Sequence, residues 1–117
     1  MTDLSALLLT VTTAHPRRGT ARVTVTGDLD MTTRPRLDAK LDEIVAELPE
    51  RLELDLLGVG FCGVTGVAAL GRLRAKCADA GIDLVLKPSR IVRRALDLAA
   101  VGPLFQVVND EPELAAR

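Results

Sequence analysis

The sequence predicts an α/β fold: a mixed, mostly parallel sheet packed against helices. Segments with alternating apolar residues, typical of strands, are separated by segments with apolar residues three and four positions apart, typical of helices. Strands that alternate with helices are joined by right-handed crossovers, so most of the sheet should be parallel. Two strand segments near the N-terminus are separated only by a polar turn, so they should form an antiparallel hairpin.

Composition narrows the class of protein. The chain has 117 residues, enough for one hydrophobic core but not for two domains. We expect a single domain over 1–117, with its core at about 7–108 and a short tail at 109–117. The formal net charge of −1 gives no reason to expect nucleic-acid binding. No secretion signal opens the chain and no apolar run is long enough to span a membrane, so we expect a cytoplasmic protein without membrane insertion.

The first part of the chain should hold the hairpin and one helix. Strand candidates lie at residues 7–13 and 21–26, with polar turns at 15–19 and 27–30. Helix-start signals follow at Thr33 and its neighbours. The apolar stripe of this helix is Leu37, Leu41, Ile44, Val45 and Leu48.

The central segment, residues 52–67, is predicted to be a buried strand that passes through a glycine-rich turn into a second helix. Leu52, Leu54 and Leu56 alternate with acidic residues, so one face of the strand is apolar. The glycines expected to permit the turn are Gly58, Gly60, Gly63 and Gly66. Helical spacing begins at Val67, and the unpaired N–H groups of a helix start favour an anion, a phosphorylated side chain or an acidic partner.

The remaining chain should hold the second helix, a strand, a third helix and a last strand. Inward positions of the second helix are Val67, Leu70, Leu73, Cys77 and Ala80. Gly81 should end this helix as a left-handed cap. A short strand at 82–86 precedes Ser89, the expected N-cap of the third helix, and a last strand is expected at 105–108.

Three segments in register point to a known family. They are the Gly-Asp-Leu-Asp sequence at 27–30, the strand exit at 55–61 and the arginine-rich helix at 89–98. With these segments in this order, the chain resembles the STAS family, in particular the single-domain anti-sigma factor antagonists, over about residues 7–116. The resemblance implies a STAS-like fold and a non-enzymatic binding module that regulates transcription by partner switching.

The resemblance also implies a partner and a binding surface. In the family, the partner is an anti-sigma factor that is also a serine kinase, and phosphorylation of a serine in the turn after the central strand breaks the complex. By resemblance, this chain should sequester such an anti-sigma factor. The residues that we expect to bind it are Asp28, Asp30, Phe61, Cys62, Gly63, Val64, Thr65 and Val67.

The turn departs from the family pattern at the phosphorylated position. Family members usually place aspartate, serine, serine or threonine, and glycine there, where this chain has Gly63, Val64, Thr65 and Gly66. Valine has no hydroxyl to phosphorylate. Thr65 is the only nearby hydroxyl, and one residue along a helix turns a side chain by about 100°. We therefore predict a degenerate phosphorylation site and a module held in or near its unphosphorylated state.

Two other functions fit parts of the sequence. STAS domains also serve as subunits of lipid-transport and stress-signalling complexes. Separately, Gly58, Gly60 and Gly63 form a literal G-x-G-x-x-G between a strand and a helix, the outline of a nucleotide-binding fingerprint. Against it, Asp83 opens its strand rather than ending it, and the chain has no room for a second mononucleotide half.

No catalytic residue, cofactor or metal is expected. His15 is the only histidine and lies in a turn, and Cys62 and Cys77 are fifteen residues apart with no histidine nearby. Cys62 either packs or, near a helix start, has a lowered pKa and becomes redox-sensitive. Asp28 and Asp30 are interpreted as turn formers and partner contacts rather than a catalytic pair. Three arginines are interpreted as a solvated face rather than a phosphate site: Arg90, Arg93 and Arg94. Whether the chain forms a homodimer stays open.

Overall fold

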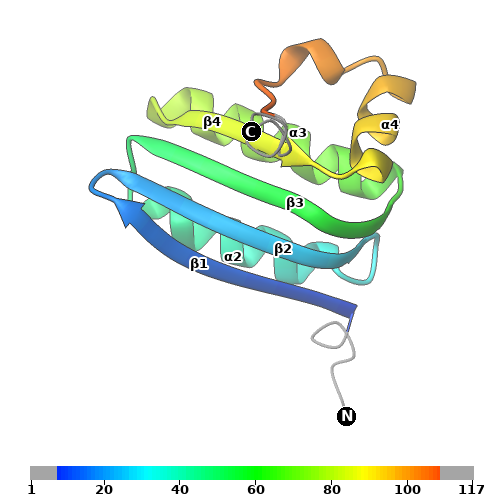
Figure 1. Ribbon diagram of the computed structural model, residues 1–117, viewed down its shortest axis with the longest axis horizontal. Coiled ribbons are helices and arrows are strands. Elements are labelled where there is room, and N and C mark those ends of the chain that lie inside the picture. Colours follow the sequence, from blue (N-terminus) through cyan, green and yellow to red (C-terminus); the bar gives the residue numbers. More distant parts are fainter. Residues whose placement is uncertain (1–7, 109–117) are drawn as a thin grey trace, which may run out of the picture.

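The computed structural model describes residues 8–108 and places a four-stranded sheet against helices (Figure 1). The elements are β1 (Leu9–Arg17), β2 (Thr20–Leu29), α2 (Arg34–Ala46), β3 (Arg51–Cys62), α3 (Val64–Ala80), β4 (Asp83–Pro88), α4 (Arg90–Leu98) and the 3-10 helix η1 (Gly102–Leu104). The sheet order is β1-β2-β3-β4; β1 is antiparallel to β2 and the other pairs are parallel. The predicted mixed sheet with its N-terminal hairpin is confirmed. The predicted tail at 109–117 lies outside the described residues.

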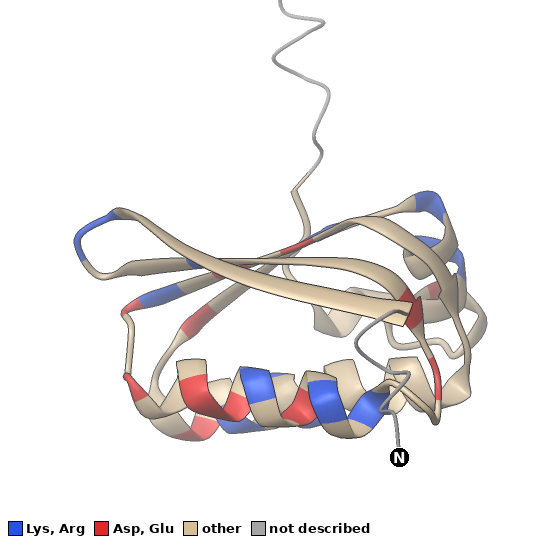
Figure 2. Cartoon of the chain, turned by 90° about the horizontal axis from the view of Figure 1, so that it is seen from below, with Lys and Arg blue, Asp and Glu red and all other residues tan. Residues whose placement is uncertain are grey.

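The core lies between the sheet and the two long helices. Figures 1 and 2 show α2 and α3 along one face of the sheet. Leu52, Leu54 and Leu56 of β3 point into this layer and are 0% exposed. Burial of each such side chain contributes roughly 1.5–3 kcal/mol. The opposite face is polar, and there Glu53 accepts ion pairs from Arg17, Arg22 and Arg51.

The glycine-rich stretch after the central strand is itself strand, contrary to the predicted turn. β3 continues through Gly58 and Gly60 to Cys62. It stays paired with β2 across two irregularities in register, and such bulges absorb an extra residue without ending a ladder. A Cβ at Gly58 would lie 2.5 Å from Thr26 Cγ2, so this glycine permits close strand packing. The G-x-G-x-x-G sequence therefore forms no phosphate-binding loop.

The predicted turns at both ends of β2 are also shorter in the structure. β1 runs to Arg17, so the hairpin turn is confined to Arg18 and Gly19. At its other end β2 continues through Gly27, which was predicted to be a turn residue. Gly27 has φ of +118°, and a Cβ there would overlap the carbonyl oxygen of Leu8. Only glycine fits a strand that bends so close to its neighbour.

Helix boundaries explain two apolar residues that the pattern wrongly placed in the core. α2 ends at Ala46, so Leu48 lies beyond the helix in a left-handed conformation with φ of 53° and is 65% exposed. Ala80 is exposed at the last position of α3, just before the left-handed cap that Gly81 provides as predicted. Both residues continue the helical spacing of apolar positions, but neither packs against the core.

The last predicted strand, at 105–108, is reduced to a single bridge. Leu86 N donates to Gln106 O at 2.9 Å and Val108 N donates to Leu86 O at 2.9 Å, which pairs Leu86 with Val107 in parallel. The next bond of a parallel ladder would need the N–H of residue 88. That residue is proline, which has no N–H, so pairing cannot extend further along β4.

An ion cluster joins α2 to α3 on the outer surface, where Figure 2 shows acidic and basic residues mixed along the helices. Arg72 donates two hydrogen bonds of 3.0 Å to the two carboxylate oxygens of Asp42. Lys76 donates a third, of 2.8 Å. The hydrogen bonds from Arg72, followed by the one from Lys76, lower the pKa of Asp42 to about 2.

Replacing Asp42 by Asn should therefore lower the free energy of unfolding by at most about 1 kcal/mol at neutral pH, because solvent screens a pair this exposed. The folded-state pKa lies below the ordinary value of 3.8, so the stabilisation is present above about pH 4 and is lost as pH falls through about 2. Denaturant unfolding from pH 7 to pH 2 should show D42N and the parent converge. Asp79→Asn, an exposed α3 residue with no ion pair among the described residues, is the control; a D42N deficit that persists at pH 2 would contradict this account.

Candidate functional site

The predicted site residues meet where β2 and β3 end and α3 begins. In the parallel ladder Asp28 lies opposite Phe61, and Leu29 lies opposite Cys62. Gly63 N donates to Leu29 O at 3.2 Å, which ties the end of β3 to the end of β2. Gly63 is also the N-cap of α3, so this helix begins at residue 64, three residues earlier than the sequence pattern indicated.

Apolar side chains dominate the exposed surface at this junction. Val64, the first residue of α3, is 87% exposed and is the most exposed large apolar side chain of residues 8–108. Phe61 is 50% exposed, and Met31, in the turn after β2, is 78% exposed. Thr65 is half-buried. Large apolar side chains grouped on a surface mark a site of association.

A groove of about 310 Å³ separates the start of α3 from α4. Its lining is Cys62, Gly63, Val64, Val67, Ala95, Leu98 and Ala99. Cys62 is 9% exposed, so it contributes to the floor of the groove rather than to the exposed surface. Leu98 is 77% exposed and was not among the predicted site residues. The sequence does carry a signal for it, because Leu98 is apolar yet lies outside the buried positions of α4.

Ser89 holds α4 in place and so fixes the far wall of the groove. Its hydroxyl donates to Val59 O at 2.8 Å and accepts from Val92 N at 3.2 Å. The second bond is the N-cap predicted from the sequence. The first attaches the start of α4 to β3 just before the junction, so both walls of the groove depend on β3.

The two acidic residues of the predicted site differ in what they bind. Asp30 Oδ1 accepts hydrogen bonds from Thr32 N at 2.9 Å and Thr33 N at 3.0 Å, so its carboxylate closes the turn before α2. The buried Thr33 hydroxyl donates to Asp28 O at 2.6 Å and braces the same turn. The carboxylate of Asp28 has no hydrogen-bond or ion-pair partner among residues 8–108. Asp28 therefore offers a carboxylate with no partner among these residues, whereas Asp30 already holds its turn through Oδ1.

The cysteines have the character of packed side chains. Burial raises the pKa of the Cys62 thiol, and burial raises that of Cys77 to about 11. Burial disfavours the thiolate, which is the form of cysteine that reacts with oxidants. The structure thus argues against the redox-sensitive thiol considered from sequence.

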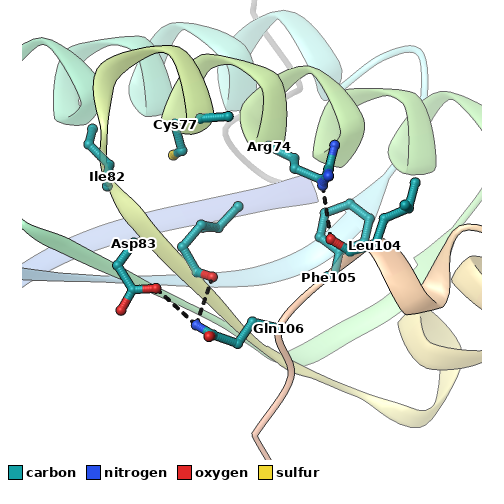
Figure 3. Close-up of a pocket in the computed structure, with 9 residues that line it drawn as sticks. Arg74, Cys77, Ile82, Asp83, Leu104, Phe105 and Gln106 are labelled. Carbon is teal, nitrogen blue, oxygen red and sulfur yellow. Dashed lines mark hydrogen bonds between the residues drawn. The ribbon is translucent and has the colours of Figure 1, made fainter.

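A second cavity, of about 200 Å³, lies beside the other half of α3 and is shown in Figure 3. Its polar groups already bind each other: Arg74 Nε donates to Leu104 O at 2.9 Å, and Gln106 Nε2 donates to Asp83 Oδ1 at 3.0 Å. These contacts hold the C-terminal segment against β4. They leave few polar groups to orient a ligand.

Two other kinds of site are absent from the described part of the chain. No group of three or more histidine, cysteine, aspartate or glutamate side chains there could hold a metal ion. Among residues 8–108, no helix has both the length and the apolar character that a membrane crossing needs.

The first turn of α3 approaches β2 so closely that Gly66 has no room for a side chain. A Cβ at Gly66 would lie 2.7 Å from Leu29 Cβ, 2.9 Å from Leu29 O and 2.9 Å from Cys62 Sγ. One of these atoms belongs to the backbone and cannot move aside cheaply. The contact therefore sets the position of α3 and of the exposed Val64.

Replacing Gly66 by Ala should lower the free energy of unfolding by about 1–3 kcal/mol, because the added methyl group overpacks the junction. Gly71→Ala is the matched control: Gly71 is exposed on the same helix, and a Cβ there would meet nothing within 4 Å. That change should stabilise the protein by about 0.5–1 kcal/mol. Equal stability of the two variants in denaturant unfolding would contradict the close contact.

Comparison with known proteins decides the family. A family model described as "Mlab, STAS domain" matches residues 12–107. This chain belongs to the STAS family. The match thus includes most of the sheet, the helices α2, α3 and α4 and the junction described above, and the resemblance noted from the sequence is confirmed.

Relatives of this STAS domain include anti-sigma factor antagonists. It is 28% identical over 101 residues to the anti-sigma-F factor antagonist RsfB of Mycobacterium tuberculosis, covering 86% of this chain and 82% of the relative. The crystal structure of an anti-sigma factor antagonist from Mycobacterium paratuberculosis superposes with a TM-score of 0.76 at 27% identity, over 92% of each chain. The unphosphorylated antagonist SpoIIAA superposes with a TM-score of 0.68 at 20% identity, over 90% of this chain and 93% of its own. At that identity the likeness shows the fold.

Proposed function

We propose that this STAS domain is an anti-sigma factor antagonist that binds its anti-sigma factor through the surface around the start of α3. The observation that carries the proposal is Val64, which is 87% exposed at the first position of α3. The half-exposed Phe61 and the apolar groove flank it. The names of the relatives support the class of partner.

The proposed surface acts by complementarity rather than by chemistry. An exposed valine beside an apolar groove loses water on contact with a partner, and a few such side chains at the centre of an interface carry most of its binding energy. The carboxylate of Asp30 closes the turn before α2, and the carboxylate of Asp28 can accept a hydrogen bond or ion pair from the partner. No reaction is assigned to the domain. Antagonism of a transcription regulator would place it in the cytoplasm.

We further propose that the serine switch of the family is absent. Val64 occupies the usual acceptor position and has no hydroxyl. Thr65 lies one helical residue further on, so its hydroxyl points about 100° away, and its side chain is half-buried. An anti-sigma factor that is also a serine kinase would therefore bind this domain without modifying it.

Replacing Val64 by Asp tests the binding surface. A charge placed where the partner packs should weaken binding by about 1 kcal/mol or more, which is about a fivefold rise in Kd. Calorimetry would use the purified chain and each purified anti-sigma factor encoded in the same genome. Leu48→Asp is the control, since Leu48 is an exposed leucine on the loop after α2, away from the junction. Equal affinity of V64D and the parent would show that the partner binds another surface.

Co-purification with a membrane ATPase or permease would favour the transport-complex alternative.

Replacing Val64 by Thr tests the missing switch, because threonine keeps the shape of valine and adds a hydroxyl. Incubation with the cognate anti-sigma factor and ATP, followed by mass spectrometry, should show phosphate on residue 64 of V64T and none on the parent. Phosphorylated V64T should then lose affinity, since the phosphate adds about −1.5 to −2 charge. Stoichiometric phosphate on Thr65 of the parent would contradict the proposal.

A further inference from the structure

We propose that the docking surface extends across the groove onto α4, and that the anti-sigma factor carries acidic side chains opposite Arg90 and Arg94. An apolar side chain of the same partner would enter the groove. This inference rests on the proposed function and adds the chemistry of the partner.

The groove continues into a second hollow on α4. This hollow, of about 400 Å³, is lined by Arg90, Ile91, Arg93, Arg94, Asp97 and Leu98. Leu98 belongs to both cavities, so it forms the ridge between them. A partner that covers Val64 and fills the groove therefore reaches the arginines next.

The spacing on α4 places these groups on one outward face. Ile91, Arg94 and Leu98 are three and four residues apart, so they lie one above another along the helix. Ile91 is 42% and Leu98 77% exposed. The other face of α4, with Val92 and Leu96, is buried in the core. The exposed face thus carries apolar and basic side chains together with one acid, Asp97.

The charges of α4 conflict with the stability of the helix itself. Arg90 is its first residue, where the partial positive charge of a helix start disfavours a cation, and its first turn has no acidic residue. Arg90 and Arg94 are four residues apart, and like charges at that spacing repel each other. Neither has an ion-pair or hydrogen-bond partner among residues 8–108. A local conflict of this kind is typical of a functional site.

An acidic protein surface resolves this conflict. Carboxylates pair with guanidinium groups in a planar, bidentate geometry, so they would relieve both the helix-start charge and the Arg90–Arg94 repulsion. The groove of about 310 Å³ is mostly apolar, so an apolar side chain of the partner that enters it would lose unfavourable contact with water. A membrane surface fits less well, because a helix that lies on lipid needs a wide apolar face, and that face of α4 is turned into the core.

The experiment compares charge reversals at the two ends of the molecule. Calorimetry with the anti-sigma factor that binds the parent would be run on R90E, R94E, R90E/R94E and R18E. Arg18 lies in the β1–β2 hairpin turn, at the opposite end from α4 (Figure 1), and its reversal changes the net charge by the same amount as R90E or R94E alone. We expect Kd to rise about tenfold or more in R90E/R94E, with a weaker dependence on salt, and to stay unchanged in R18E.

A second measurement separates lost contact from lost folding. R90E places an acid at the start of α4, which favours the helix, so its Tm should rise by about 1–4 °C while its affinity falls. If V64D weakens binding but R90E/R94E binds the anti-sigma factor as tightly as the parent does, this inference is overturned and the proposed function stands. No binding of the parent to any anti-sigma factor would overturn both. The parent could instead bind phosphatidylglycerol vesicles, and R90E/R94E could lose that binding while keeping its affinity for the anti-sigma factor. That result would assign α4 to a membrane surface and overturn the inference.

Discussion

The contact between Gly66 and Leu29 is the constraint on which the candidate site depends. It allows the first turn of α3 to pack directly on the end of β2, with no side chain between them. The bond from Gly63 N to Leu29 O fixes the same junction along the strands. Together they leave one direction for Val64, away from the sheet and into solvent.

Sequence periodicity predicted the elements of the fold because burial on one face imposes it. The alternating leucines of β3 and most of the predicted apolar stripes of α2 and α3 face the one core. The same reasoning failed where residues distant in sequence but close in space determine the backbone conformation. Gly27, Gly58 and Gly60 favour turns as a local pattern, yet the paired strand beside them keeps them extended through bulges. The missing N–H of Pro88, which shortened the last strand, acts on a segment almost twenty residues away.

The candidate site likewise has a part that could be predicted from the sequence and a part that could not. Residues contiguous in sequence, from Phe61 to Val67, were predicted as a unit, and the structure keeps them together. The groove could not be predicted, because its second wall comes from α4, some thirty residues later. Its position depends on the Ser89 hydroxyl binding Val59 O, a contact that no local pattern reveals. The hydrogen bonds that distinguish the carboxylate of Asp30 from that of Asp28 likewise depend on the fold around them.

The absence of a hydroxyl on Val64 has a consequence for how a cell would use such a domain. A relative with a phosphate acceptor can be inactivated and reused, whereas a domain without an acceptor acts by stoichiometry, one molecule against one anti-sigma factor. Under the proposed function, release of the sigma factor would begin steeply once copies of this chain outnumber those of its target. Synthesis and proteolysis would then set the timing of the response.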